Sequence, residues 1–552
     1  MNTDVLIIGS GPIGATYARI IAEQKPDAKI LMIDLGPRLT DKAGQHTKNI
    51  SNPADMEAAL IKSQGNKQTA YPPISVPQRA LAVQKGELTA DILARAGTHL
   101  ATDQPEDLAK NQMPAAAMSS NVGGMGSHWT CACPTPGNAE RIPFIPEAEY
   151  EAAFAKAKEL LCVTQNAFPE TPESLAIMKT LGSVFNEKLG KDRQVQPMPL
   201  ACKVNENGER YWTGADLILG EMAAPQPQKG ESSFPNFELR SETLCRRLFT
   251  EGVQNDSKPK TQNSKLENTE GGKITGALIE HLPTGKQEEI HAKIVIVACD
   301  ALRTPQLLWA SGIRPKALGH YLNEHPFIFT FVELKEDLVD KICRDAMHRV
   351  STYNPNSRTE PTIGVFWVPF DAPHHPFHGQ IMHMDLSPMK TTIAPPLGAG
   401  GAKHIVGLGW GCLKSVQYKD RIVFSKTKTD YLGMPKMNFK FQYTEGDKKN
   451  IEDAKKMQLQ AAEAFGKVIK DGDQTVMPAG TSLHYQGTTR MGETNDGTSV
   501  CDTYSQVWGF DNLFVGGNGV IPMSTTSNPT LTSVAMAVRA CEKIKTYLHQ
   551  LY

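Results

Sequence analysis

The pattern of hydrophobic and polar residues is clearest at the start of the chain. Residues 4–8 form a predicted strand that is apolar from Val5 onward, a glycine turn with the spacing G-x-G-x-x-G follows over residues 9–14, and residues 12–24 have helical periodicity. A second predicted strand covers residues 29–33, is apolar from Ile30 onward and is followed by Asp34. Strand, glycine turn, helix, strand and acidic residue in this order are typical of a nucleotide-binding βαβ unit. The pattern predicts a dinucleotide site.

Each glycine of this turn has a predicted role. Gly9 permits the tight turn, Gly11 lets the backbone approach a pyrophosphate, and Gly14 lets the helix pack closely on the strand. The start of the helix offers free N–H groups to the phosphates. Asp34 suits a pair of ribose hydroxyls and disfavours a 2′-phosphate. These features do not distinguish NAD from FAD.

The middle of the chain is less regular. Residues 36–115 are polar and interrupted by prolines, which predicts an excursion over the surface. Helices are predicted at 53–63, 80–97, 146–161, 172–189 and 448–470. A further helix is predicted to begin at Thr304, with Pro305 in its first turn. Strands are predicted at 236–250, 292–298, 362–369 and 437–443, with 245–249 and 274–281 paired as a ribbon around the polar run 254–273. The glycine- and proline-rich stretch 391–401 is expected to act as a gating loop.

The C-terminal seventy residues combine a strand with a well-marked helix start. Residues 512–517 read as a strand that ends in glycines. Asn528 is a good N-cap and Pro529 suits the first helical position, so a helix is predicted from there to about residue 548. The positive end of that helix could stabilise negative charge on a nearby ring. This region provides a predicted second contact to the cofactor.

Composition narrows the class of protein. The chain has 552 residues, 40% of them hydrophobic, which is enough for more than one lobe. A formal net charge of −1 gives no case for nucleic acid or an anionic membrane as partner. No stretch is long and apolar enough to span a membrane, and the first strand leaves no room for a signal peptide. The ten cysteines fit a reduced, cytoplasmic protein, and the Cys131-x-Cys133 pair is a poor metal site, so no metal is predicted.

The stretch 119–130 has an unusual density of small and polar residues around a His-Trp-Thr triplet. Such a stretch lets backbone lie against a flat ligand. A structural loop with an incidental histidine is the alternative from the local sequence. Near the C-terminus, His484 precedes a G-T-x-R-M-G stretch.

Taken together, these motifs resemble the glucose–methanol–choline family of flavin-dependent oxidoreductases. The resemblance rests on the N-terminal G-S-G-P-I-G, on Gly123 to Thr130, on residues 295–313, on Leu322-Asn-Glu-His-Pro326 and on the C-terminal block with Asn528-Pro-Thr-Leu-Thr532. Within that family the sequence is most similar to pyranose oxidases and bacterial glycoside 3-oxidases. The resemblance is weak over 36–115 and much of 331–480.

The resemblance implies an α/β fold, with a Rossmann-like FAD-binding domain and an inserted substrate-binding domain of β-sheet and helices. The expected FAD-binding domain is discontinuous and comprises residues 1–50, 115–140, 200–330 and 481–552. The expected lid covers 51–114, and the expected substrate domain covers 141–199 and 331–480.

The resemblance also implies roles for particular residues. His484 would be the catalytic base and Asn528 its partner, whereas Thr130, Gln380 and Asp385 would contact the substrate. FAD would be bound by Gly9, Gly11, Pro12, Ile13, Gly14, Asp34, Gly123, Gly124, Ser127, His128, Trp129, Thr130, Cys245, Gly517, Asn518, Pro529 and Thr530. His128 matches the residue that carries the flavin covalently in pyranose oxidases, and both covalent and non-covalent attachment stay open.

The sequence departs from the family at two places. Gly411 follows Trp410 where fungal pyranose oxidases have an arginine, which argues against free glucose as the substrate. Cys299-Asp300 replaces the Ala-Gly that is usual at the end of that strand.

The predicted function is FAD-dependent oxidation of a secondary ring hydroxyl of a sugar or glycoside to a ketone. Oxidation at C3 of a glycoside, including C-glycosides, is favoured over oxidation at C2. Electrons would pass to O2, giving hydrogen peroxide, or to a quinone. A pyranose 2-oxidase acting on glucose, an oxygen-insensitive sugar dehydrogenase and a flavin-binding protein without turnover are the alternatives. A homo-oligomer is compatible with the sequence.

Overall fold

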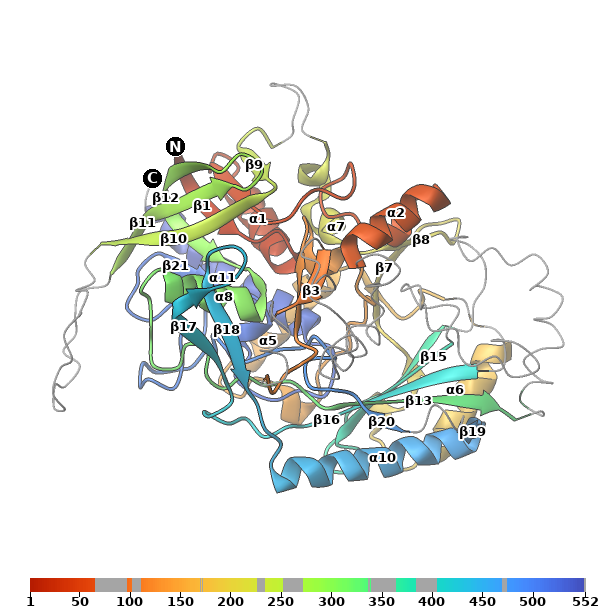
Figure 1. Ribbon diagram of the computed structural model, residues 1–552. Helices are drawn as coiled ribbons and strands as arrows, with labels where there is room; N and C mark the ends of the chain where they lie inside the picture. The colour runs from red at the N-terminus through yellow and green to blue at the C-terminus, as the bar shows by residue number, and fades with distance from the viewer. Residues whose placement is uncertain are drawn as a thin grey trace.

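A computed structural model of the chain describes residues 1–64, 97–101, 111–168, 170, 172–225, 234–251, 272–335, 338, 364–383, 405–468 and 474–550. Figure 1 shows two sheets with helices packed on them, and smaller strand pairs between and beside them. The predicted gating loop 391–401, most of the polar run 254–273 and nearly all of the predicted helix 80–97 lie outside the described residues.

The first sheet has seven strands in the order β10-β11-β12-β1-β2-β9, and β21 pairs with β12. β1, β2, β9, β12 and β21 run parallel, whereas β10 and β11 form an antiparallel ribbon, as predicted. The bounds are β1 (Asn2–Ile8), β2 (Ile30–Ile33), β9 (Phe237–Arg240), β10 (Thr243–Glu251), β11 (Lys273–His281), β12 (Lys286–Val297) and β21 (Leu513–Val515). The predicted βαβ unit is therefore confirmed.

Parallel pairing places the carboxyl ends of distant segments at one edge of this sheet. Ile8 pairs with Val297, and Val297 pairs with Val515. The residues that follow these strands therefore meet at the edge where α/β sheets bind ligands. Helix α1 (Pro12–Gln24) begins there, and it packs against α11 (Thr530–Gln550) and α7 (Ala215–Leu219).

The second sheet also has seven strands, in the order β19-β13-β16-β15-β14-β6, with β20 paired to β13. Helix α10 (Glu445–Phe465) runs along it, and α6 (Pro172–Phe185) packs against α10 and β14, as Figure 1 shows. The strands are β6 (Gln196–Pro197), β13 (Phe327–Leu334), β14 (Val365–Val368), β15 (Phe377–His383), β16 (Ile405–Cys412), β19 (Gly466–Val468) and β20 (Thr475–Val476).

Smaller elements join the two sheets. The remaining strands form the pairs β3 (Gly97–Leu100) with β4 (Ala117–Ser120) and β17 (Arg421–Thr429) with β18 (Pro435–Lys440), and the triplet β5 (Val163–Thr164), β7 (Leu200–Val204) and β8 (Arg210–Trp212). Helix α2 covers Pro53–Gln64. Helix α5 (Glu147–Leu160) packs against α11 of the nucleotide-binding half. The division into domains stays a prediction.

The predicted start of the helix after β12 is wrong. Helix α8 spans Asp300–Ala310, so Pro305 lies inside the helix and not in its first turn. Proline cannot donate a hydrogen bond to the carbonyl four residues before it, which belongs to Ala301. The hydroxyl of Thr488 donates to that carbonyl at 2.5 Å instead. A contact from a distant segment therefore satisfies the group that the proline leaves free.

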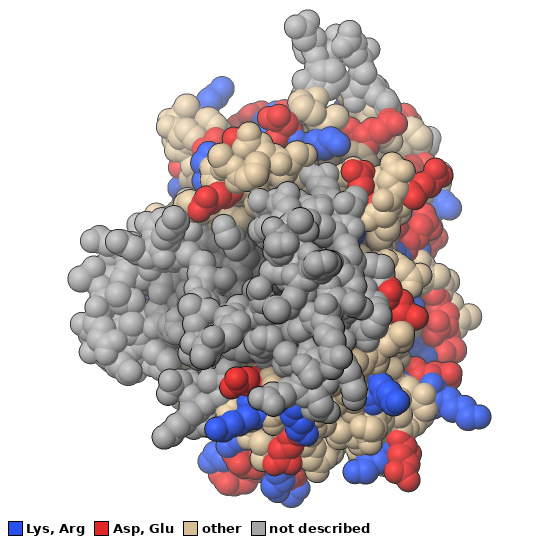
Figure 2. Space-filling model, turned by 90° about the vertical axis from the view of Figure 1, so that its right-hand side faces the viewer, with Lys and Arg blue, Asp and Glu red and all other residues tan. Residues whose placement is uncertain are grey.

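The surface carries charges of both signs. Figure 2 shows Lys and Arg interspersed with Asp and Glu over the described part of one face, in keeping with the net charge of −1. Within the described residues, no helix combines the length and apolar character needed to cross a bilayer.

Candidate active site

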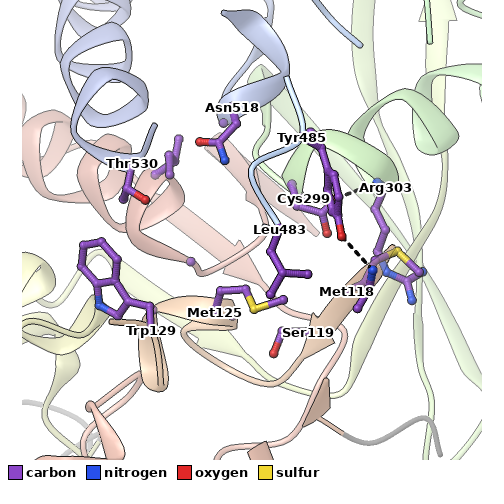
Figure 3. A pocket seen from close by; sticks show the side chains of 18 of the residues that line it. Met118, Ser119, Met125, Trp129, Cys299, Arg303, Leu483, Tyr485, Asn518 and Thr530 are labelled. Carbon is purple, nitrogen blue, oxygen red and sulfur yellow. Dashed lines mark hydrogen bonds between the residues drawn. The ribbon is translucent and has the colours of Figure 1, made fainter. Parts of the chain in front are cut away.

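A cavity of about 370 Å³ lies between the glycine turn after β1 and the second sheet. Figure 3 shows Trp129 and Thr530 on one side of it, Met118 and Arg303 on the other, and Leu483 and Met125 between them. Most residues predicted to bind cofactor or substrate line it, namely Gly9, Gly11, Pro12, Ile13, Asp34, Gly124, His128, Trp129, Thr130, Cys245, Gln380, His484, Gly517, Asn518, Asn528 and Thr530. Gly14, Gly123, Ser127 and Pro529 are not lining residues, and Asp385 lies outside the described residues.

The glycines show that this edge of the cavity fits a dinucleotide. A Cβ on Gly9, whose φ is +107°, would lie 2.3 Å from the carbonyl oxygen of Ala298, and a Cβ on Gly14 would lie 2.0 Å from that of Gly9. Gly11 and Gly517 are different, because the nearest atom to an added Cβ is 3.9 Å away at each, and both line the cavity. Their backbones are therefore open to a ligand at the start of α1.

Asp34 joins three segments at this end of the cavity. One carboxylate oxygen accepts hydrogen bonds from the backbone N–H and the hydroxyl of Ser10, at 3.0 and 2.6 Å, and the other accepts from the N–H of Gly36 at 2.9 Å. The Ser10 hydroxyl oxygen accepts in turn from the N–H of Gly123. Asp34 therefore holds the glycine turn in place, a role that was not predicted from the sequence.

The Gly123–Thr130 stretch contains a short 3-10 helix, Gly124–Ser127, and lies along the same cavity. The indole N–H of Trp129 donates to the carbonyl of Thr213 at 2.7 Å. Nδ1 of His46 accepts from Lys48 N–H, and its Nε2 is 3.1 Å from the carbonyl oxygen of Trp129. These contacts fix the backbone that leads into Thr130.

His484 and Asn528 meet in the cavity, although 44 positions separate them. The side-chain nitrogen of Asn528 lies 3.2 Å from Nε2 of His484. An amide nitrogen can only donate, so Nε2 accepts and the proton of the neutral imidazole is on Nδ1. Nδ1 of His484 lies 2.8 Å from Nε2 of His325 and donates to it. The arrangement leaves Nε2 as the basic atom on the Asn528 side.

A buried carboxylate positions the segment that carries His484. Glu324 accepts hydrogen bonds from the hydroxyl of Ser482 at 2.6 Å, from the N–H of Leu483 at 3.1 Å and from the N–H of Gly480. The oxygen of Ser482 accepts in turn from the N–H of His484. Burial raises the pKa of Glu324 to about 7, and these hydrogen bonds act in the opposite direction. Glu324 thus fixes the backbone just before the histidine.

A second buried carboxylate holds the segment before Asn528. Glu140 accepts from the N–H and the hydroxyl of Thr526, at 2.6 and 2.7 Å, and from the N–H of Gly137 at 3.0 Å. Burial raises its pKa, and the bonds from Thr526 lower it. Each half of the His484–Asn528 pair is therefore tied to its own internal carboxylate.

The histidines around the pair are neutral. Burial lowers the pKa of His325 to about 4. Burial and the nearby His325 ring lower the pKa of His378 to about 3. Burial together with these two rings lowers the pKa of His484 well below its ordinary value. A neutral imidazole can accept a proton, which suits a general base. Among the described residues, no group of His, Cys, Asp and Glu side chains could hold a metal ion.

Strand β15 forms part of the cavity wall. Gln380 lines it together with His378, two positions earlier on the same strand. Gly411, on the neighbouring strand β16, pairs with His378, and a Cβ there would lie 2.2 Å from the carbonyl oxygen of Thr526 and 3.1 Å from Nδ1 of His325. A side chain at 411 would overlap the backbone carbonyl of Thr526, so this packing favours glycine over arginine at the position.

Several lining residues were missed from the sequence. His325 lies in a stretch that carries the family resemblance and His378 lies two residues before Gln380, but neither histidine was assigned a role. Alternation along residues 378–380 is the signal that could have identified His378, since every second residue of a strand shares a face. The hydrogen-bond partners of the Arg303 and Glu324 side chains lie in distant segments, so local sequence does not reveal them.

Comparison with known proteins identifies the family of this chain. The GMC oxidoreductase family models match residues 236–327 and 421–537. The chain is 39% identical to a C-glycoside 3-oxidase of Microbacterium trichothecenolyticum, over 98% of this chain and 96% of the relative. It is 40% identical to one of Arthrobacter globiformis, over 98% and 94%.

More distant proteins extend the comparison. A pyranose 2-oxidase of Tricholoma matsutake is 31% identical over 99% of this chain and 94% of the relative. Among solved structures, formate oxidase has a TM-score of 0.64 at 14% identity, covering 100% of this chain and 99% of that one. Pyridoxine 4-oxidase from Mesorbium loti has a TM-score of 0.58 at 15% identity, covering 99% of each, and these two show the fold alone. The chain belongs to the GMC oxidoreductase family.

Proposed function

We propose that this protein oxidises the C3 hydroxyl of a glycoside, including C-glycosides, to a ketone, with FAD as cofactor. The observation that carries the proposal is the His484–Asn528 pair, which lies in the cavity that begins at the glycine turn. The full-length relatives named C-glycoside 3-oxidase support the position of oxidation and the substrate class.

The roles of the pair follow from their hydrogen bonds. Oxidation of a secondary alcohol removes the O–H proton and the C–H hydride. Nε2 of His484 accepts the O–H proton, because Nδ1 is already protonated and bound to His325. Asn528 donates a hydrogen bond to the same oxygen and orients it. The distance of 3.2 Å between the two groups allows both to contact one oxygen atom.

FAD fits the remaining lining. Gly11, Gly124 and Gly517 present open backbone along the cavity, and α1 and α11 both begin beside it. When bound, FAD supplies the hydride acceptor of the reaction. Thr130, Trp129 and Asn518 would lie along it, and Asp34 and Cys245 would lie at the end where β2 and β10 meet it.

The regiochemistry is tested by product analysis. The purified protein is incubated with glucose and with a glucoside, and the new carbonyl is located by NMR. A 3-keto product from the glucoside supports the proposal. A 2-keto product from glucose, without turnover of the glucoside, would refute the proposed C3 oxidation. It would favour a pyranose 2-oxidase, the activity named for the 31% identical relative.

The final electron acceptor is O2 or a quinone. Stopped-flow reoxidation of the reduced protein by air and by benzoquinone separates the two. Reoxidation by benzoquinone alone would make the protein a dehydrogenase of the same fold.

We predict that the acid limb of kcat/KM lies well below pH 6.5. Burial, His325 and His378 lower the pKa of His484, so the proton-accepting form persists as the pH falls through 6.5. Activity is lost only when the pH reaches the lowered pKa. Rates of anaerobic reduction from pH 4 to 8 check this. Glu324, whose pKa burial raises to about 7, also titrates beside the His484 segment, so an inflection at or above 6.5 that persists in Glu324→Gln would contradict the prediction.

We also predict that acid precipitation releases FAD into the supernatant. Nδ1 of His128 lies 3.1 Å from the Ser127 hydroxyl and Nε2 lies 3.1 Å from the Thr98 hydroxyl, so covalent attachment would require one of these bonds to be given up. The absorption spectra of pellet and supernatant are the measurement. A yellow pellet that becomes colourless in the His128→Ala variant would establish a covalent bond instead.

A further inference from the structure

The imidazole of His378 is held in one tautomer at the wall of the cavity. The indole N–H of Trp367 donates to its Nδ1 at 3.0 Å, and an indole nitrogen can only donate, so Nδ1 carries no proton. Burial lowers the pKa of His378 to about 3, which makes the ring neutral. The single ring proton is therefore on Nε2. His378 presents an N–H donor on the side of the ring away from Trp367.

Gln380 is the side chain placed to meet that donor. His378 and Gln380 are two residues apart on β15, so they project from the same face, and both line the cavity. Their partners on β16 are Gly411 and Gly409, which put no side chain between them. Nε2 of His378 makes no hydrogen bond of ordinary geometry to any described residue. Burial lowers the pKa of His378, and the neighbouring Gln380 side chain acts in the opposite direction.

We propose that His378 is a positioning residue that sets the orientation of the Gln380 amide, an inference that rests on the proposed function. An N–H group faces an amide oxygen, because two donors would repel each other. The oxygen of Gln380 is therefore directed at Nε2 of His378, and its NH2 group is directed into the cavity. There the NH2 group donates to a hydroxyl oxygen of the sugar other than the one that His484 deprotonates.

The chain Trp367–His378–Gln380 thus determines the hydrogen-bonding character of the substrate site. A free glutamine could present either its oxygen or its NH2 group to the substrate. With His378 in this tautomer, position 380 is a donor only. The site then prefers substrates that place an acceptor oxygen opposite Gln380. This preference is lost when Trp367 no longer fixes the tautomer of His378.

The test is a double-mutant cycle in the holoenzyme. The variants His378→Phe, Gln380→Leu and the double variant are compared with the wild type in anaerobic flavin reduction by a glucoside. We expect each single variant to raise the apparent Kd by about 5- to 10-fold, which corresponds to one lost hydrogen bond. The limiting rate of reduction at pH 8 should stay within about twofold, because His484 and Asn528 are retained and burial, the main cause of the lowered pKa of His484, still keeps that histidine neutral. The double variant should bind no more weakly than Gln380→Leu alone.

Each outcome of the cycle decides the question. Additive effects in the double variant would overturn the proposal, because His378 would then act independently of Gln380. An unchanged Kd in His378→Phe would overturn it as well. Failure of the proposed function would give a different result: no glycoside would reduce the flavin of the wild-type protein.

A second variant covers the case in which His378→Phe does not fold. Trp367→Phe keeps most of the ring and removes the donor that fixes the tautomer, and it should raise the Kd several-fold while the FAD content stays unchanged. His374→Phe, at an exposed position of the β14–β15 turn, is the matched control and should have no effect. A wild-type Kd in Trp367→Phe would overturn the proposal.

Discussion

Replacing His484 by alanine is expected to slow flavin reduction by the substrate by about 10²- to 10⁴-fold, the range for loss of a positioned general base. The side chain is the only one that contacts both Asn528 and His325 in the described part of the site. Its segment is held by Glu324 through Ser482, so the backbone should keep its place in the variant. FAD content and the melting temperature should therefore change little.

Anaerobic stopped-flow reduction of the holoenzyme is the measurement. The matched control is His374→Ala, at an exposed position of the β14–β15 turn, which should reduce its flavin at the wild-type rate. A His484→Ala protein that is fully loaded with FAD and reduced at the wild-type rate by every sugar tested would refute the assignment of the base. Loss of FAD from this variant would instead indicate that the histidine supports the cofactor.

Local patterns account for the parts of this protein that could be predicted from the sequence. The strand–turn–helix at 2–24 is encoded by consecutive residues, and α1 spans the predicted residues 12–24. Asn528 followed by Pro529 marks the start of α11, which begins at Thr530. In each case the residues that predict the element also form it, so contacts with the rest of the fold do not change its secondary structure.

The site depends on contacts that no local pattern records. Glu324 meets Ser482 across 158 positions, and Glu140 meets Thr526 across 386. Pro305 would ordinarily end or open a helix, but Thr488 satisfies the carbonyl that it leaves free, and the helix continues. The sequence shows that glycine replaces an arginine at position 411, but only the structure shows that the Thr526 carbonyl and His325 leave little room for a side chain there. The resemblance predicted His484 and Asn528 as the reacting pair, and the three-dimensional structure shows which carboxylates hold the segments of these two residues.

Gly14→Ala is expected to weaken FAD binding by about tenfold or more and to lower the melting temperature of the holoenzyme. The new Cβ would lie 2.0 Å from the carbonyl oxygen of Gly9, and backbone cannot move aside as a flexible side chain can. Relief of the overlap shifts α1 away from the turn, at a cost near the upper end of the ~1–3 kcal/mol typical of overpacking. The shift moves the N–H groups that should face the cofactor phosphates.

Gly446→Ala provides the matched control, because Gly446 also lies in the first turn of a helix, α10. An added Cβ there would be 3.6 Å from the Thr444 hydroxyl oxygen, an ordinary contact. The higher helix propensity of alanine should make this variant as stable as the wild type or more stable, by up to about 1 kcal/mol. FAD content after gel filtration and thermal unfolding of both holoenzymes are the measurements. If both variants retained FAD equally, the close approach of α1 to the glycine turn would not be what positions the cofactor.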